Sequence, residues 1–344
     1  MSDNSSYDAV LVLGFGGPEQ ADDVLPFLER VVAGRGVPRE RLLGVAEHYY
    51  KLGGKSPIND QCRSLLGVLR AELSQHGISL PVYWGNRNWH PLLADTLRQM
   101  RDDGIKRALV YVTSAFSSYS GCRQYREAME KAQAELGAGA PALDKLRIFY
   151  NHPLFVDAIV ARAQETLAGG AAQAHLVFTA HSIPLAMASG CDYVAQLQEV
   201  AAAVSSRLGR SEFDLAYQSR SGSPHVPWLE PDIGDHLRAL HGRGVREVAV
   251  VPFGFVSDHM EVVWDLDHEA SAIAAELGMR FYRVQTVGEH PSFVAMLREL
   301  VEERLGRVQT RRTISGSAPR PDRCAPDCCT YIPRRPPGAA VGGR

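Results

Sequence analysis

Long apolar runs are missing from this sequence, and cysteine is scarce. No stretch reaches the roughly 18 uninterrupted apolar residues that a membrane-spanning helix needs. The first residues, MSDNSSYDAV, lack the basic start and apolar run of a secretory signal. Six cysteines in 344 residues are too few for a disulfide-stapled secreted fold. We therefore expect a cytoplasmic protein with an ordinary hydrophobic core.

Several common active-site motifs are absent as well. The chain has no Gly-x-Ser-x-Gly nucleophile turn and no Gly-x-x-x-x-Gly-Lys-Ser/Thr phosphate loop. The stretch GFGGP at 14–18 does not continue as the Gly-x-Gly-x-x-Gly of a dinucleotide site. A hydrolase of that type, a P-loop enzyme and a dehydrogenase are therefore poor interpretations.

An excess of basic charge occurs only at the C-terminal end. The whole chain has a formal charge of −2, whereas residues 307–344 hold eight Arg against Asp322 and Asp327, a local charge of +6. The same segment has six prolines and little apolar material, which is typical of an extended or disordered tail. We interpret it as a linker-like tail and expect no nucleic-acid partner.

What the chain does contain is a regular alternation of short apolar runs and longer helical patterns. Continuous apolar runs indicate parallel strands that are covered on both faces. The runs that we expect to form strands are 8–18, 80–88, 107–116, 174–184, 213–222 and 246–255. The fold class is therefore α/β, with parallel sheets flanked by helices.

The two halves of the chain resemble each other. GIKRALVYVTSAF from Gly104 parallels GVREVAVVPFGFV from Gly244, and two further strand ends match in the same order. We expect two similar doubly wound, Rossmann-like domains around a central cleft, at 1–150 and 151–306, followed by the tail at 307–344. Extra chain at 19–57 would form a wall of that cleft, because insertions beside strand ends commonly do so.

Acidic residues at helical spacing follow the last of these strands. In SDHMEVVWDLDHE (257–269), Asp258, Glu261, Asp265 and Glu269 would lie on one helix face. His181 ends the strand HLVFTA, so its side chain should open on the same edge of the sheet as Glu261. An imidazole and a carboxylate together could serve a hydrolase, a metal site or an isomerase.

Five co-linear motifs make the chain resemble the ferrochelatase family. They are GFGGP, GGKSPIN, FTAHSIP, YQSRSG with PHVPWLEP, and PFGFVSDHMEVVWDLDHE, and they extend over most of 7–306. More narrowly, the chain resembles actinobacterial coproporphyrin ferrochelatases, which insert ferrous iron into coproporphyrin III on the way to haem b. The resemblance implies a chelatase-type fold with two four-stranded parallel sheets around a porphyrin cleft.

The resemblance also implies roles for particular residues. His181 and Glu261 would bind ferrous iron or receive the protons of the ring, and Asp265 and Glu269 would extend this path outward. Porphyrin-contacting positions fall on Phe15, Ser56 and Tyr125. Phe15 stands where some related enzymes have a Tyr that faces the metal, so no oxygen ligand is expected there.

The periphery of the substrate suggests further contacts. Coproporphyrin carries four propionates, so its pocket should offer cations. The candidates near the expected cleft are Arg30, Arg35, Lys55, Arg123 and Arg126. The insertion EQADDVLPFLERVVAGRGVP is polar rather than greasy, which favours coproporphyrin over the more apolar protoporphyrin IX.

Three cysteines gather in the tail, in RCAPDCCTY. Such density in a reducing compartment indicates a metal or iron–sulfur site more than disulfides. Related ferrochelatases with a [2Fe–2S] cluster take one ligand from the region of SSYSGCRQY. The resemblance thus implies Cys122, Cys324, Cys328 and Cys329 as ligands, with Cys191 and Cys62 as alternatives for the fourth.

Other functions stay open at this point. A protoporphyrin IX ferrochelatase, a sirohydrochlorin chelatase and a non-catalytic porphyrin or haem carrier would all need a similar cleft. The acidic row argues against a carrier, which has no use for a proton path. As partners we expect coproporphyrin III and Fe²⁺, with a transient iron donor and a downstream enzyme of the haem pathway.

Overall fold

The computed structural model describes residues 6–34, 36–222, 225–314 and 316–331. Arg35 and the last part of the tail, 332–344, for which we predicted roles above, lie outside the described residues. Within them, no helix is long and apolar enough to cross a membrane.

In the part of the chain that the structure describes, eight strands form two parallel sheets of four. The first sheet has the order β2-β1-β3-β4 and the second the order β6-β5-β7-β8. Each sheet therefore repeats one topology, as the internal resemblance predicted. The strands are β1 Ala9–Gly14, β2 Val82–Asn86, β3 Arg107–Val112, β4 Ala142–Lys145, β5 His175–His181, β6 Asp214–Gln218, β7 Glu247–Val251 and β8 Arg280–Arg283.

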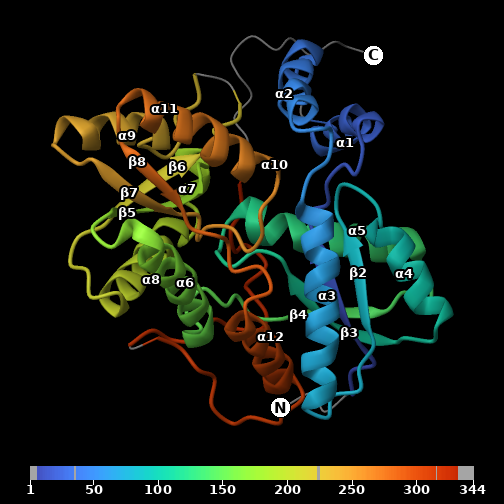
Figure 1. The fold of residues 1–344 in the computed structure, drawn as a ribbon. Coiled ribbons are helices and arrows are strands. Elements are labelled where there is room, and N and C mark those ends of the chain that lie inside the picture. Colours follow the sequence, from blue (N-terminus) through green and yellow to red (C-terminus); the bar gives the residue numbers. More distant parts are fainter. Residues whose placement is uncertain (1–5, 35, 223–224, 315, 332–344) are drawn as a thin grey trace.

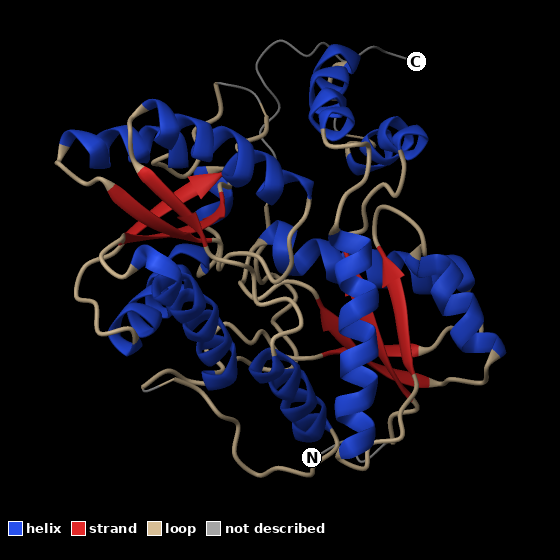
Figure 2. Ribbon diagram, viewed as in Figure 1, coloured by secondary structure: helices blue, strands red, loops and turns tan. Residues whose placement is uncertain are grey.

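Helices cover both faces of each sheet (Figure 2). The α-helices are α1 Val24–Val31, α2 Arg39–Lys51, α3 Ile58–Gln75, α4 Leu93–Asp102, α5 Gln124–Leu136, α6 Pro153–Thr166, α7 Leu185–Ala188, α8 Tyr193–Arg207, α9 Ile233–Gly242, α10 Met260–Val262, α11 Ser271–Glu276 and α12 Pro291–Arg304. A short 3₁₀ turn, η1 Ala21–Asp23, precedes α1, and three π-helical segments are η2 Tyr119–Arg123, η3 Leu167–Ala171 and η4 Val263–Ala270.

One large core joins the two sheets. Val10 of β1 and Phe178 of β5 belong to the same buried cluster, together with Phe293 and Leu297 of α12. The opposite face of the first sheet packs against α4 and α5, and that of the second against α9, η4 and α11. Because the apolar strands are covered on both sides, their functional side chains can emerge only at the strand ends.

The extra chain at 19–57, called the insertion below, stands apart from the sheets as α1 and α2 (Figure 1). It has a small core of its own, in which Phe27 and Tyr49 are buried. Met260, the first residue of α10, packs into that core. The insertion is thus bound to the segment that carries the acidic row.

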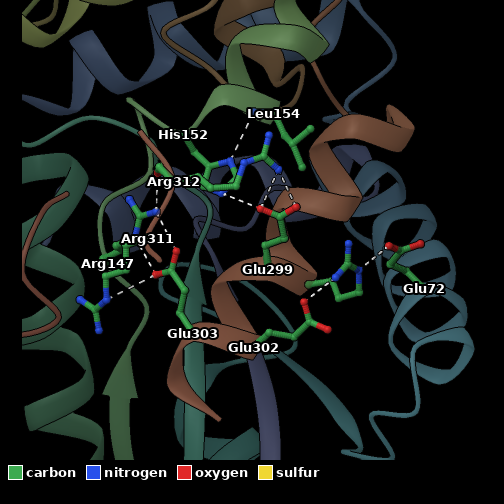
Figure 3. A network of polar contacts seen from close by, with 10 residues as sticks. Glu72, Arg147, His152, Leu154, Glu299, Glu302, Glu303, Arg311 and Arg312 are labelled. Atoms are coloured by element: carbon green, nitrogen blue, oxygen red, sulfur yellow. Dashed lines mark hydrogen bonds and ion pairs between the residues drawn. The ribbon is translucent and has the colours of Figure 1, made fainter. Parts of the chain in front are cut away.

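The tail is irregular but not loose as far as residue 331. Arg311 and Arg312 join a polar network with Arg147, Glu299 and Glu303 (Figure 3). Further along, Ile314 is buried and its N–H donates to the Asn151 carbonyl oxygen at 2.8 Å. The cysteine-bearing segment that follows lies against the first half of the chain, where Arg123 and Arg126 donate to the Pro326 carbonyl.

Candidate functional site

His181 ends β5 with its ring half-exposed, whereas the preceding strand residues are buried. Its Nδ1 lies 2.5 Å from the carbonyl oxygen of Ser182. A carbonyl oxygen can only accept, so Nδ1 carries the proton and Nε2 keeps its lone pair. The Tyr193 hydroxyl donates to the His181 carbonyl at 3.1 Å. When the ring is neutral, it therefore has the tautomer in which Nε2 is the basic nitrogen.

Glu261 faces that lone pair. Its Oε2 lies 3.7 Å from His181 Nε2 and 3.9 Å from His259 Nδ1. Burial lowers the pKa of His259, which keeps this second imidazole neutral near pH 7. The structure thus places the two residues predicted from the strand end and the acidic row side by side. We had not assigned a role to His259, although it belongs to the same quoted motif.

Asp265 lies one turn further along, at the start of the π-helix η4. Burial raises the pKa of its carboxyl to about 7, while a hydrogen bond from the Ser219 hydroxyl opposes the rise. Ser219 has a φ of 61°, in the left-handed region that non-glycine residues rarely adopt. A carboxyl with this pKa exchanges a proton readily at neutral pH, as a relay requires.

The remaining acids of the segment do not all join this row. Glu269 accepts a hydrogen bond from Trp264 Nε1 at 2.8 Å. The prediction that Asp258 shares the helical face was wrong, because the helix begins only at Met260. Asp258 instead forms an ion pair with Arg283 at 2.8 Å. A three-member row of Glu261, Asp265 and Glu269 remains.

The insertion supplies the opposite side of the site. Phe15, which follows β1, contacts Phe27 edge-on with ring centroids 6.3 Å apart. Phe27 in turn contacts Tyr49, at 6.1 Å. Tyr49 is buried, which raises its pKa, and the nearby charge of Glu261 raises it further. This continuous chain of contacts connects Phe15 of the first half to Glu261 and His181 of the second.

The two glycine-rich motifs of the first half contact each other beneath Phe15. Ser56 is buried, and its N–H donates to the Pro18 carbonyl at 2.9 Å. A Cβ on Gly17 would meet the Ser56 side chain at 2.8 Å, so only glycine fits there. Ser56 thus lies directly against the loop that carries Phe15.

Tyr125, the other expected porphyrin contact, is buried in the core beside the first sheet. The guanidinium of Arg87 lies over its ring at 4.6 Å and over the Phe15 ring at 5.9 Å. Arg87 follows β2 directly, donates from Nη2 to Gln124 Oε1 at 3.4 Å, and opposes the rise that burial causes in the pKa of Tyr125. We had not singled it out. Its position after a buried strand, VYWGNR, was the signal that could have identified it.

The predicted propionate-binding cations have different surroundings. Arg30 is exposed on α1, and Lys55 pairs with Asp60 at 2.5 Å. Arg123 donates to the Pro326 carbonyl at 2.7 Å, and Arg126 to the same oxygen at 2.8 Å. Both guanidinium groups are thus engaged by the tail, and substrate binding by these two arginines stays a prediction.

The tail cysteines lie next to Cys122 of η2. Hydrogen bonds join Cys122 to Cys324 and Cys324 to Cys328, and the Sγ atoms of Cys328 and Cys329 are 3.4 Å apart. Cys329 has a φ of 54°, again in the left-handed region. The hydrogen bond from Cys122 lowers the pKa of Cys324 to about 7, which favours its thiolate.

Cys191, an alternative ligand, is electrostatically close to Cys122 and Cys328, whereas Cys62 is buried near Tyr111 and Tyr125 instead. Within the described part of the chain, no group of three or more His, Cys, Asp or Glu side chains has the arrangement of a single-ion site. The four thiols form a chain rather than a shell around one point.

Two surface pockets lie away from these residues. One, of about 530 Å³, is at the beginning of β5 and β7, and one of about 630 Å³ is beside β2. Both are at the edges where strands begin or along an outer strand, whereas His181 and Glu261 lie where strands end. Neither pocket is therefore lined by His181 or Glu261.

The arrangement of two parallel sheets, with an imidazole and a carboxylate at the strand ends, defines a chelatase-type fold. Solved structures with this fold include SirB from Bacillus subtilis with Fe³⁺, at a TM-score of 0.57, 12% identity, and coverage of 88% of this chain and 97% of that chain. Another is DR2241 from Deinococcus radiodurans, at a TM-score of 0.53, 18% identity, and coverage of 86% and 55%.

The sequence comparisons identify the family itself. The family model described as Ferrochelatase matches residues 7–305. A ferrochelatase of Rhodopirellula baltica is 50% identical over 100% of this chain and 99% of its own length. Coproporphyrin III ferrochelatases of Streptomyces coelicolor and Mycolicibacterium smegmatis are 49% and 50% identical, over 99% and 92% of this chain and 97% and 95% of theirs. This chain belongs to the ferrochelatase family.

Proposed function

We propose that this protein inserts ferrous iron into coproporphyrin III, giving iron-coproporphyrin III in haem b synthesis. The observation that carries the proposal is the pair of His181 Nε2 and Glu261 Oε2, 3.7 Å apart at the strand ends of a ferrochelatase-family fold. The names of the Streptomyces and Mycolicibacterium relatives, at about half identity over nearly the full chain, support coproporphyrin as the substrate.

The chemistry needs a proton acceptor and a weak iron site at one place. A free porphyrin loses two inner N–H protons when a divalent ion enters, so charge is conserved only if those protons leave. In neutral His181 the lone pair is at Nε2, because Nδ1 donates to the Ser182 carbonyl, and an imidazole is a suitable proton acceptor for this step. Carboxylates such as Glu261 bind divalent iron weakly enough to release it, unlike thiolates.

The acidic row provides the route outward for those protons. Asp265, with its pKa raised to about 7 by burial, can take a proton at neutral pH and lose it again. Glu269 lies beyond it and is exposed to solvent. An acceptor of this kind lets His181 return to its neutral form between turnovers, which repeated metallation requires.

A cation next to aromatic rings suits the periphery of the porphyrin. Arg87 lies over the rings of Phe15 and Tyr125, and within the described residues no carboxylate is paired with it. Guanidinium groups bind carboxylates in a bidentate way, so Arg87 can receive a propionate. Arg30, exposed on the insertion, can receive another. Lys55 is the third candidate, and a propionate would replace Asp60 as the partner of its ammonium group.

An anaerobic metallation assay tests the proposal. Purified protein is mixed with Fe²⁺ and either coproporphyrin III or protoporphyrin IX, and the change in the visible spectrum is followed. We expect turnover with a clear preference for coproporphyrin III. A preference for protoporphyrin IX would overturn the substrate, and binding without metallation would indicate a carrier. The cytoplasmic location, the iron donor and the acceptor of the product stay predictions.

We also propose a [2Fe–2S] cluster on Cys122, Cys324, Cys328 and Cys329. Such a cluster takes four thiolates. Neighbouring thiols run in a chain from Cys122 of η2 to Cys324, Cys328 and Cys329 of the tail, and a cluster would have to draw these four sulfurs around its iron atoms. The hydrogen bond with Cys324 and burial raise the pKa of Cys122, and Lys145 Nζ, 3.3 Å from Cys122 Sγ, opposes that rise. The cluster would lock the tail onto the body, away from the ring chemistry.

Visible absorption of the anaerobically purified protein tests the cluster. We expect a coloured protein that contains iron and acid-labile sulfide, and loss of both in a Cys324→Ser variant. A Cys62→Ser variant is the matched control, because that cysteine is buried away from the tail. Colourless protein without bound sulfide would contradict the proposal.

A further inference from the structure

Arg283, the last residue of β8, contacts the acidic segment at two points. Its Nη2 lies 2.8 Å from Asp258 Oδ1, and its Nε lies 3.1 Å from Asp267 Oδ1. The remaining nitrogen, Nη1, donates to the carbonyl of Val284 at 2.8 Å. The side chain is only 14% exposed. All three nitrogens of this guanidinium are thus engaged in a largely buried place.

The two aspartates lie on either side of the residues proposed to carry iron and protons. Asp258 precedes the start of α10, and Asp267 lies within η4, so Glu261 and Asp265 are between them in the sequence. A planar guanidinium holds its partners at fixed directions. One side chain from the neighbouring strand therefore holds both ends of the segment 258–267.

This contact also divides the five acids of the segment into two groups. Asp258 and Asp267 both pair with Arg283, whose single positive charge offsets one of their two negative charges. Among the described residues, no Lys or Arg forms an ion pair with Glu261, Asp265 or Glu269. These three carboxylates contact His181, Ser219 and Trp264 respectively. Without Arg283, five like charges within twelve residues would repel one another. The arginine thus compensates the acids that do not face His181 and leaves the other three available.

Asp258 is tied to the first half of the chain as well. Its N–H donates to Gln61 Oε1 of α3 at 2.8 Å. The segment is therefore held between β8 on one side and α3 on the other. A shift of Asp258 would move Glu261, three residues later, relative to His181, which belongs to a different strand.

We propose that Arg283 is a positioning residue for iron insertion: by pairing with Asp258 and Asp267, it sets Glu261 opposite His181. The proposal rests on the proposed function. Among the described residues, Arg283 contacts Asp258, Asp267 and the Val284 carbonyl rather than His181 or the insertion, so its loss should affect iron rather than porphyrin. Partners that orient metal-binding side chains typically change metal affinity or activity by about 10- to 100-fold when removed.

The test compares Arg283→Met with Arg280→Met. Arg280 begins the same strand, is 68% exposed and pairs with Glu247, outside the acidic segment. For Arg283→Met we expect kcat/KM for Fe²⁺ to fall by about 10- to 100-fold while KM for coproporphyrin III is unchanged. Arg280→Met should match the wild type. Arg283→Lys should restore thermal stability more fully than kcat/KM for Fe²⁺. Lysine keeps the positive charge, but its ammonium group lacks the planar fork that holds both aspartates in place.

A double-mutant cycle and a binding measurement distinguish positioning from folding. If Arg283 acts through Asp267, then Arg283→Met combined with Asp267→Asn should be no worse than Arg283→Met alone. Anaerobic equilibrium dialysis of Fe²⁺ without porphyrin should show the same loss of affinity in Arg283→Met. Wild-type iron affinity and kinetics in that variant would overturn the inference. A wild-type protein that binds iron but does not metallate the porphyrin would overturn the proposed function alone.

Discussion

The state of one imidazole decides what the site can do. His181 donates from Nδ1 to a backbone carbonyl, so the nitrogen facing Glu261 is the one with the lone pair. Hydrogen bonding of one ring nitrogen commonly sets the tautomer of the other in this way. Nε2 is therefore the ring nitrogen that can take up a proton from the porphyrin.

Replacing this imidazole should separate binding from chemistry. In His181→Ala we expect metallation to fall by at least about 10²-fold, the low end for loss of a general base, while coproporphyrin still binds. His175→Ala is the control, because His175 starts the same strand and pairs with Asp214 instead. Metallation rates and porphyrin fluorescence quenching are the two measurements. Full activity of His181→Ala would contradict the assignment.

Asp265 should leave a signature in the pH dependence of stability. Burial raises its pKa to about 7 in the folded state, so this state holds a proton that the unfolded chain releases near pH 4. Stability from this group is present below pH 4 and is lost as pH rises through 7. Asp265→Asn should therefore be more stable than the wild type at pH 8 by about 1–3 kcal/mol, and similar at pH 4–5.

Urea unfolding at the two pH values measures this difference. Asp267→Asn is the control, since Asp267 is paired with Arg283 and is not on the row. If the wild type is instead more stable than Asp265→Asn at pH 8, then ionised Asp265 does not destabilise the fold. The proposed role of Asp265 in proton transfer would then be contradicted.

At the scale of elements, the contact between α2 and η4 encloses the site. The ring of His48 stacks on that of Trp264, with centroids 4.1 Å apart and planes at 9°. The ammonium of Lys51 lies 5.5 Å from the same indole. Trp264 also donates to Glu269, the outermost acid of the row. Helix α2 of the insertion therefore contacts the π-helix η4, which carries Asp265.

Breaking this stack should loosen the insertion over the bound porphyrin. Stacked rings contribute about 0.5–1.5 kcal/mol, so His48→Ala and Trp264→Ala should each weaken coproporphyrin binding by about 2- to 10-fold. The double variant should be no worse than either single variant, because both remove one contact. Leu43→Ala, at an exposed position of the same helix, should bind normally. Additive losses in the fluorescence titration would refute the shared contact.

The longer elements could be predicted from the sequence, but the shortest ones could not. Each of the six strands expected from apolar runs is present, as β1 to β3 and β5 to β7. The edge strands Ala142–Lys145 and Arg280–Arg283 were not predicted. Four residues carry too little periodicity to be distinguished from a loop. The π-helical form of 263–270 also escaped notice, since it depends on hydrogen bonds rather than on composition.

At the scale of the whole molecule, buried charge fastens the tail. Arg147 is 2% exposed, and its Nε and Nη2 lie 2.8 and 2.9 Å from the carboxylate of Glu303. The same Nη2 donates to the Arg312 carbonyl at 3.0 Å. The pair thus links the end of β4, helix α12 and the tail (Figure 3).

Removing one member of this pair should be costly. Arg147→Met leaves the buried Glu303 with only the more distant Arg311, 3.9 Å away, so we expect the free energy of unfolding to fall by about 3 kcal/mol. Arg323→Met is the control: its pair with Asp144 is made by a side chain that is 77% exposed, and should contribute at most about 1 kcal/mol. Urea unfolding followed by tryptophan fluorescence gives both values. Equal effects of the two variants would contradict a buried role for Arg147.

The sequence by itself determined the strand ends and the residues on them. His181 and Glu261 follow buried apolar strands, and the carboxyl ends of parallel strands meet at one edge of a sheet, so their proximity could be predicted. Only the tertiary structure decided which charged groups pair. Arg283 selects Asp258 and Asp267, the tail covers Arg123 and Arg126, and the tail cysteines reach Cys122. Such pairings join residues far apart in the chain, where local spacing carries no information about distance.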